Sequence, residues 1–182
     1  MQASDEELMQ RYGAGDAGAF DRLYARHRAP LYRFVLRCVK ERAVAEDLYQ
    51  EIWMRVIEAR GRYEPRAKFT TWLYTIAHNR LVDHWRRLGP APVSLDGADA
   101  AFDPPAGEAA DPARVFDGRE KLARFAQALA ALPPAQREAF LLSEEAGFTV
   151  AEIARATGAN EEAAKSRLRY ALAKLRAAVG DD

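Results

Sequence analysis

The sequence is poor in several residue types on which whole classes of protein depend. It holds one cysteine, Cys38, which excludes a disulfide within the chain and a cysteine-based metal knuckle. No stretch approaches the roughly 18 uncharged apolar residues that a membrane helix needs. The first 20 residues are polar and acidic, without the apolar core of a signal peptide. We therefore expect a cytoplasmic protein that does not insert into membranes.

Recognisable catalytic motifs are also missing. The sequence has no nucleophile elbow, no phosphate-binding P-loop and no glycine-rich dinucleotide turn. Its histidines give no metal-ligand spacing, because His78 and His84 point to different sides of one predicted helix. We expect no metal, no cofactor, no small-molecule substrate and no enzymatic activity. A small helical metal-dependent hydrolase is the alternative of that class, with the carboxylates of Glu46, Asp47 and Glu51 as its ligands.

An excess of charge of one sign is missing from the chain as a whole, but not from its parts. Twenty-seven lysines and arginines balance 27 aspartates and glutamates. Residues 1–87 carry 16 basic and 12 acidic side chains, residues 88–112 carry none and five, and residues 113–182 carry 11 and 10. Because local patches set the field at a binding surface, a formal net charge of zero does not exclude binding to nucleic acid.

Residues 88–112 form an acidic stretch without the periodicity of a helix or a strand. Five of these 25 residues are proline and three are glycine, which is typical of a flexible linker that proline stiffens locally. The linker is either a simple spacer or an acidic segment that threads a basic channel and mimics nucleic acid. In both cases it separates a domain over residues 1–87 from a second domain over residues 113–182.

Strand signals are absent on both sides of this linker. Alternating β-branched runs are missing, while alanine, leucine, glutamate and arginine dominate. Ser4 with Glu7 predicts the start of a first helix and Asp16 the start of a second. Pro30 predicts a kink or a break within the second helix. We predict an all-α fold of two small helical domains, with further helices near residues 44–59, 70–87, 113–131, 135–145, 149–156 and 160–178.

Residues 149–178 carry the pattern of a helix-turn-helix. Thr149 and Glu152 form a capping box for a short helix, and Asn160 can cap a second one. Between the two helices, Gly158 suits the left-handed backbone of a tight turn. Two short helices joined in this way are typical of proteins that place the second helix in the major groove of DNA.

The second helix of this motif has an outward face suited to DNA. Between residues 165 and 176 it carries five basic side chains and no acidic one. Short polar and arginine side chains at the centre, with cations at the rims, fit base edges and phosphates respectively. A solvated helical face is the alternative interpretation of such a run. The residues expected to contact DNA are Glu162, Lys165, Ser166, Arg167, Arg169, Tyr170 and Lys174.

Two further segments of the N-terminal domain have faces that suit a partner. Residues 69–87 predict a half-buried helix whose polar arc carries Thr71, Thr75 and Asn79 beside aromatic residues. Stacking rings and amide groups are what single-stranded nucleic acid requires, although the same spacing serves any half-buried helix. Residues 46–53 predict a helix with an exposed acidic face that a basic partner helix could bind.

Five short motifs follow one another along the chain: DLYQEIW at 47–53, FTTWLYTIAHN at 69–79, Leu132-Pro133, TVAEIA at 149–154 and AKSRL at 164–168. In this combination and order they resemble bacterial sigma factors, in particular the small two-domain extracytoplasmic function (ECF) group of the sigma-70 family. The resemblance covers the chain from about residue 8 to residue 178.

The resemblance implies a non-enzymatic subunit that binds core RNA polymerase and directs it to promoters, with an anti-sigma factor as its usual partner. In this family the first domain docks on a coiled coil of the largest polymerase subunit, and the acidic linker passes through channels near the RNA exit path. A stand-alone helix-turn-helix regulator that binds an operator without polymerase is the alternative. The residues assigned to the polymerase interface are Asp47, Gln50, Glu51 and Met54.

The resemblance also divides the promoter contacts between the two domains. The helix at 69–87 and the loop around 61–68 would melt and capture the −10 element, with Asn79 lining the pocket for a flipped base. The C-terminal helix would read the −35 element as duplex. Its sequence preference cannot be transferred, because the family often has an aromatic residue where this chain has Arg169. The residues assigned to the −10 element are Lys68, Thr71, Trp72, Thr75, His78, Asn79, Arg86 and Arg87.

Overall fold

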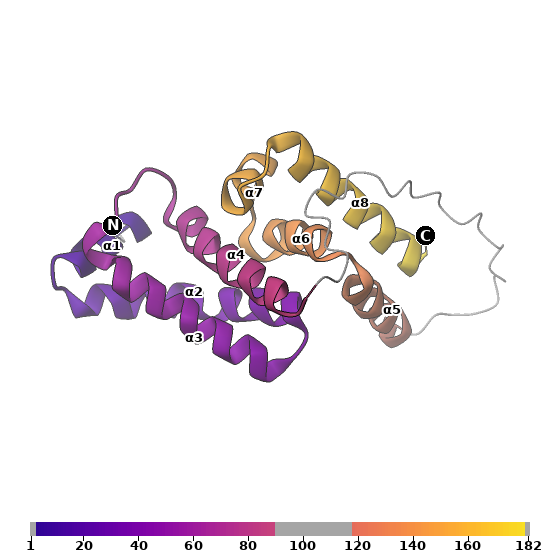
Figure 1. Cartoon of the computed structure of the whole chain (residues 1–182), viewed down its shortest axis with the longest axis horizontal. Coiled ribbons are helices and arrows are strands. Elements are labelled where there is room, and N and C mark those ends of the chain that lie inside the picture. The colour runs from indigo at the N-terminus through magenta and orange to yellow at the C-terminus, as the bar shows by residue number, and fades with distance from the viewer. Residues whose placement is uncertain (1–2, 90–117, 181–182) are drawn as a thin grey trace.

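The computed structural model describes residues 3–89 and 118–180, and Figure 1 shows how their helices are arranged. Within these residues the backbone forms eight α-helices, one short 3₁₀ helix and no strand. The all-α fold predicted from the sequence is thereby confirmed. Most of the predicted linker, and the first residues of the helix predicted from residue 113, lie outside the described residues.

The N-terminal half, residues 3–89, contains four α-helices. The first two begin at the caps that the sequence predicts, because Ser4 accepts a hydrogen bond from the backbone of Glu7, and Asp16 accepts one from that of Ala19. The elements are α1 (Asp5–Gly13), α2 (Ala17–Val39), α3 (Arg42–Ala59), the 3₁₀ helix η1 (Arg60–Arg62) and α4 (Phe69–Arg87).

The break that Pro30 predicted is wrong, because α2 runs through this residue as a single helix. A proline in a helix interior costs about 3 kcal/mol. Leu23 on one side of Pro30, and Leu31 and Phe34 on the other, are fully buried. Burying each such side chain contributes about 1.5–3 kcal/mol, so tertiary packing on both sides outweighs the local penalty.

The C-terminal half, residues 118–180, contains the predicted helix-turn-helix. The capping box of Thr149 and Glu152 starts one helix, and Asn160 caps the next by accepting a hydrogen bond from the Ala163 backbone. Gly158 lies between them with a φ of 64°, in the left-handed region that favours glycine. The elements are α5 (Gly118–Ala131), α6 (Pro134–Ala146), α7 (Val150–Thr157) and α8 (Glu161–Val179).

The two halves pack against each other along two pairs of helices. α2 lies against α6, and α4 lies against α7 (Figure 1). At this junction the rings of Tyr74 and Phe148 meet edge to face, with their centroids 5.4 Å apart. Cys38, near the end of α2, is 1% exposed. Buried side chains of both halves thus form one continuous hydrophobic core.

Candidate polymerase and promoter surfaces

The polar residues predicted on α3 lie on one exposed face. The opposite side of the helix is apolar and faces the core, with Ile52 and Val56 completely buried. Met54 on the outer side keeps 54% of its surface exposed. The four residues predicted to contact polymerase all belong to the exposed face: Asp47, Gln50, Glu51 and Met54.

This exposed face borders a groove between α3 and α4. Besides the four predicted residues, the groove is lined by Arg55 and Glu58 of α3 and by Arg80 and Arg87 of α4. Arg80 is paired with Asp83, one turn further along α4, at 2.5 Å. Carboxylates beside an exposed thioether suit a partner helix that presents basic and apolar side chains.

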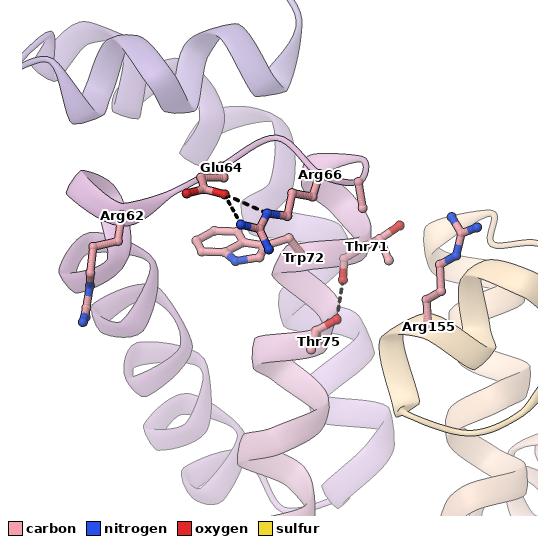
Figure 2. A pocket seen from close by; sticks show the side chains of 8 residues that line it. Arg62, Glu64, Arg66, Thr71, Trp72, Thr75 and Arg155 are labelled. Carbon is pink, nitrogen blue, oxygen red and sulfur yellow. Dashed lines mark hydrogen bonds and ion pairs between the residues drawn. The ribbon is translucent and has the colours of Figure 1, made fainter.

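A second pocket lies where the loop of residues 62–67 meets the start of α4, and Figure 2 shows its lining. Arg62 is the last residue of η1, Arg66 comes from the loop that follows, Trp72 comes from α4, and Arg155 of α7 lies across the pocket. Glu64 pairs with Arg66 at 2.5 Å. Positive charge around an indole ring suits the phosphates and unstacked bases of a single strand.

The residues of α4 that face this pocket are themselves held in place. The Trp72 ring meets Tyr63 edge to face at 5.0 Å and lies 5.8 Å from Phe69. The hydroxyl of Thr75 donates a hydrogen bond to the backbone carbonyl of Thr71 at 2.8 Å, and Thr71 is only 5% exposed. The pocket is therefore preformed around a half-buried indole ring rather than a freely exposed one.

Two residues predicted to contact the −10 element pair with glutamates of the C-terminal half, although the Lys68 side chain stays 72% exposed and only that of His78, at 13%, is largely covered. Lys68 donates from Nζ to Oε1 of Glu152 at 2.7 Å, and Nδ1 of His78 lies 2.8 Å from Oε1 of Glu138. The hydrogen bonds from Lys68 and from the Thr149 backbone lower the pKa of Glu152 to about 2. This carboxylate is thus ionised at neutral pH and forms a full ion pair with Lys68.

The remaining residues of the predicted −10 set lie further along α4. Asn79 and Arg86 are exposed to solvent. Arg87 lines the groove beside α3 and not the pocket at the start of α4. The structure therefore does not gather the predicted set into one site. Some residues line the pocket, Lys68 and His78 pair with the C-terminal half, Asn79 and Arg86 are exposed, and Arg87 lies on the α3 groove.

The inner side of α8 packs against the core, and Leu175 on that side is 4% exposed. The guanidinium of Arg169 lies over the Tyr170 ring, 5.2 Å from its centroid. Lys174 donates to Gln136 of α6 at 3.2 Å, so it is held against its own half. Of the predicted −35 residues, the exposed ones are Glu162, Lys165 and Arg169, and the half-buried ones are Ser166, Arg167, Tyr170 and Lys174.

Sequence reasoning missed the polar contacts that join the two halves. Arg137 of α6 is 7% exposed and donates from Nη1 to the backbone carbonyl of Cys38 at 2.7 Å. Glu145 pairs with Arg33 at 3.0 Å and also with Arg37, both on α2. From the sequence, an arginine in an amphipathic helix is expected at the surface. The partner of Arg137, the carbonyl of Cys38, lies 99 positions away. No local pattern could have identified this contact.

The part of the chain that the structure describes contains no group of three or more His, Cys, Asp or Glu side chains that could hold a metal ion. Of the carboxylates considered as metal ligands, Glu46 pairs with Arg42 at 2.8 Å, and Asp47 and Glu51 face the groove. The hydrolase alternative gains no support from this arrangement of carboxylates.

Within the described residues no helix is both long and apolar enough to cross a bilayer.

Comparison with known proteins gives two family matches. The model for Sigma-70 region 2 matches residues 23–90, and the model for Sigma-70, region 4 matches residues 122–175. The chain is 37% identical over 174 residues to RNA polymerase sigma factor CarQ from Myxococcus xanthus, covering 95% of this chain and 96% of CarQ. It is 32% identical over 176 residues to ECF RNA polymerase sigma factor SigK from Mycobacterium sp. (strain KMS), covering 95% and 89%.

Solved structures with a similar fold include CnrH in complex with the cytosolic domain of CnrY, with a TM-score of 0.69, 25% identity and 96% of each chain covered. They also include the sigma factor RpoE from Bartonella quintana in complex with the anti-sigma factor NepR. For that pair the TM-score is 0.64 and the identity 25%, over 86% of this chain and 94% of RpoE.

Two packed helical halves, matched by Sigma-70 region 2 and Sigma-70, region 4 and the second containing a helix-turn-helix, define a transcription initiation factor. The chain belongs to the sigma-70 family and, within it, to the ECF group. It is a sigma factor, the subunit that directs core RNA polymerase to promoters. The alternative of a stand-alone regulator finds no support among these relatives.

Proposed function

We propose that this sigma factor uses three separate surfaces. The outer face of α3 docks on the largest subunits of core RNA polymerase, the start of α4 with the loop at 62–67 captures the −10 element as a melted strand, and α8 reads the −35 element as duplex. The protein supplies no catalytic group and acts in the cytoplasm, where polymerase and chromosome meet. The exposed acidic face of α3 is the observation that carries the proposal.

The docking face on α3 remains accessible although the two halves are packed together. Asp47 and Glu51 present carboxylates one helical turn apart, and Met54 adds an exposed apolar side chain in the same groove. Opposite charges steer encounter and fix the register of two helices, while the adaptable thioether adds apolar contact area. A coiled coil with basic residues is therefore a suitable partner for this groove.

The −10 surface combines positive charge with an aromatic platform. Arg62 and Arg66, from the same half as Trp72, line the pocket of Figure 2 together with its half-buried ring, which supports binding of a phosphate backbone with an extruded base. Lys68 and His78 currently contact glutamates of the C-terminal half. For His78, which is 13% exposed, to reach DNA, the halves must separate once the chain is bound to polymerase, whereas Lys68, which is 72% exposed, needs only to exchange its carboxylate partner for a phosphate.

A protein partner that restrains the sigma factor is a further part of the proposal. The structurally similar RpoE was solved together with the anti-sigma factor NepR, which supports an anti-sigma protein as a partner of this chain. Such a partner would have to cover a face that polymerase or promoter DNA needs, and the exposed α3 groove is one such face.

The docking proposal is tested by reversing one charge on α3. Glu51→Arg should weaken binding to purified core polymerase at least tenfold in a pull-down titration, because repulsion replaces attraction at the interface. Asp21→Arg makes the same charge change on the exposed side of α2, outside the groove, and should bind like the wild type. Equal binding by Glu51→Arg and the wild type would contradict the proposed docking face.

A further inference from the structure

The helix α4 does not receive its N-terminal cap from a neighbouring residue. Lys68, which occupies the N-cap position, directs its side chain to Glu152 instead. The first N–H group of the helix, that of Phe69, donates to Oε1 of Glu6 at 2.6 Å, across 63 positions of sequence. A carboxylate at this point satisfies an otherwise orphaned donor and also interacts favourably with the positive end of the helix dipole.

The helix that carries Glu6 is itself firmly fixed to the N-terminal half. Leu8 and Met9 of α1 are completely buried. Asp5 accepts a hydrogen bond from Arg26 at 2.6 Å and faces Nε2 of His27 at 2.7 Å, both on α2. Because α1 is anchored by apolar packing and by these polar contacts, the carboxylate of Glu6 is held at a defined place.

The other end of α1 contacts the beginning of the loop that leads into α4. A Cβ atom on Gly13 would lie 2.6 Å from the backbone carbonyl oxygen of Arg60, so only glycine permits this approach. The guanidinium of Arg60 lies 5.5 Å from the centroid of the Tyr12 ring. α1 therefore touches both ends of the segment from residue 60 to residue 69.

Between these two ends, Tyr63 connects the segment to the aromatic residues of α4. Its ring lies 6.2 Å from Phe69 and 5.0 Å from Trp72. Burial, together with the nearby carboxylates of Glu6 and Asp5, raises the pKa of Tyr63 to about 12. The tyrosine ring therefore links the segment to the start of α4, and its hydroxyl is buried without a hydrogen-bond partner among the described residues.

We propose that α1 braces the −10 pocket and that Glu6 is a positioning residue for promoter melting. The brace fixes the start of α4 and the loop of residues 60–68, so the pocket around Trp72 is preformed before DNA arrives. This inference rests on the proposed function of that pocket. It also gives a role to α1, which precedes residues 23–90 matched by the region 2 model.

The brace itself is tested on the free chain by amide hydrogen exchange of Phe69, followed by NMR. Glu6→Ala should raise the exchange rate at least tenfold, because the N–H loses its charged acceptor. Glu6→Gln keeps an oxygen acceptor and should change the rate much less. Gln10→Ala removes an exposed side chain from the same helix and should leave the rate unchanged. Gly13→Ala should raise exchange at the loop residues that follow Arg60.

The functional arm uses holoenzyme assembled from the full chain and core polymerase. On an intact promoter, Glu6→Ala should reduce permanganate reactivity of the −10 thymines several-fold, while Glu6→Gln restores most of it. Both variants should bind core polymerase like the wild type and should match it on a template that is already melted. A defect that came only from lower stability would appear on both templates.

Three outcomes would overturn the proposal. The first is unchanged Phe69 exchange in Glu6→Ala, and the second is normal promoter melting despite faster exchange. The third is a Glu6→Gln variant as defective as Glu6→Ala, since the acceptor oxygen would then not be what matters. If the wild-type chain itself produced no open complex, the proposed function of the pocket would fail, and the exchange of Phe69 would still decide whether Glu6 braces α4.

Discussion

Arg169 and Lys165 illustrate how neighbouring cations on one helix can have different tasks. Both are exposed on α8, but Arg169 is oriented by its contact with the Tyr170 ring at the centre of the outward face. A guanidinium oriented in this way can make a bidentate contact with a base edge. Lys165 lies toward the rim, where an ammonium is better placed for a phosphate and carries no sequence information.

We therefore expect Arg169→Ala to relax sequence preference at one or two positions of the −35 element, with a loss of about 1–3 kcal/mol of discrimination. Lys165→Ala should weaken binding to all sequences about equally. It should also reduce the slope of log K against the logarithm of the salt concentration by about one, because one phosphate contact is lost. A library of −35 elements transcribed by holoenzyme measures both effects. The opposite pattern, with altered preference only in Lys165→Ala, would contradict these assignments.

At the scale of the elements, the turn between α7 and α8 depends on the backbone of one residue. Gly158 has a φ of 64°, and the space around its missing Cβ is open. Gly158→Ala should therefore lower the free energy of unfolding by about 1 kcal/mol, the strain of an alanine in the left-handed region. Urea unfolding measures this loss. Gly61→Ala, also in open space but with an ordinary φ, should leave stability nearly unchanged, and an equal loss in both variants would refute the turn argument.

Local signals predicted the helices well and the contacts between them poorly. Ser4, Asp16 and Thr149 cap helices as the sequence indicates, because a cap involves residues only three positions apart. The break considered at Pro30 does not occur, because the local cost of the proline is outweighed by packing that the sequence does not display. The cap that Glu6 provides for α4 spans 63 positions, so only the tertiary structure shows it.

For the candidate surfaces too, the sequence indicates which residues share one face of a helix, but not which residues of different helices meet. The outer face of α3 follows from helical periodicity, so its four residues emerge together on one surface. Periodicity cannot say that His78 faces Glu138 of the other half, or that Arg87 lies on the α3 groove. Those positions depend on how helices distant in sequence pack together.

At the scale of the whole molecule, the packing of the two halves controls which surfaces are available. Glu145 of α6 is paired with two arginines of α2, whereas the adjacent Glu144 is exposed. Glu145→Arg should therefore push the halves apart, since like charges at such a contact cost several kcal/mol. Glu144→Arg makes the same charge change without a partner across the junction and serves as the matched control.

The thiol of Cys38 reports this separation. It is buried beside α6, and burial raises the pKa of the thiol well above its usual range, so it should react slowly in the packed chain. We expect Glu145→Arg to accelerate labelling by a thiol reagent at least tenfold, and Glu144→Arg to label like the wild type. Equal rates in all three proteins would show that this contact does not hold the halves together.

Whether this chain gives core RNA polymerase its promoter specificity is tested by run-off transcription on fragmented DNA of the bacterium that encodes it, using its purified core polymerase with and without the chain. We expect new transcripts that begin downstream of a shared pair of −35 and −10 elements and appear only when polymerase and chain are both present. Tight binding of the chain alone to a palindromic duplex, with no new transcripts, would contradict this expectation.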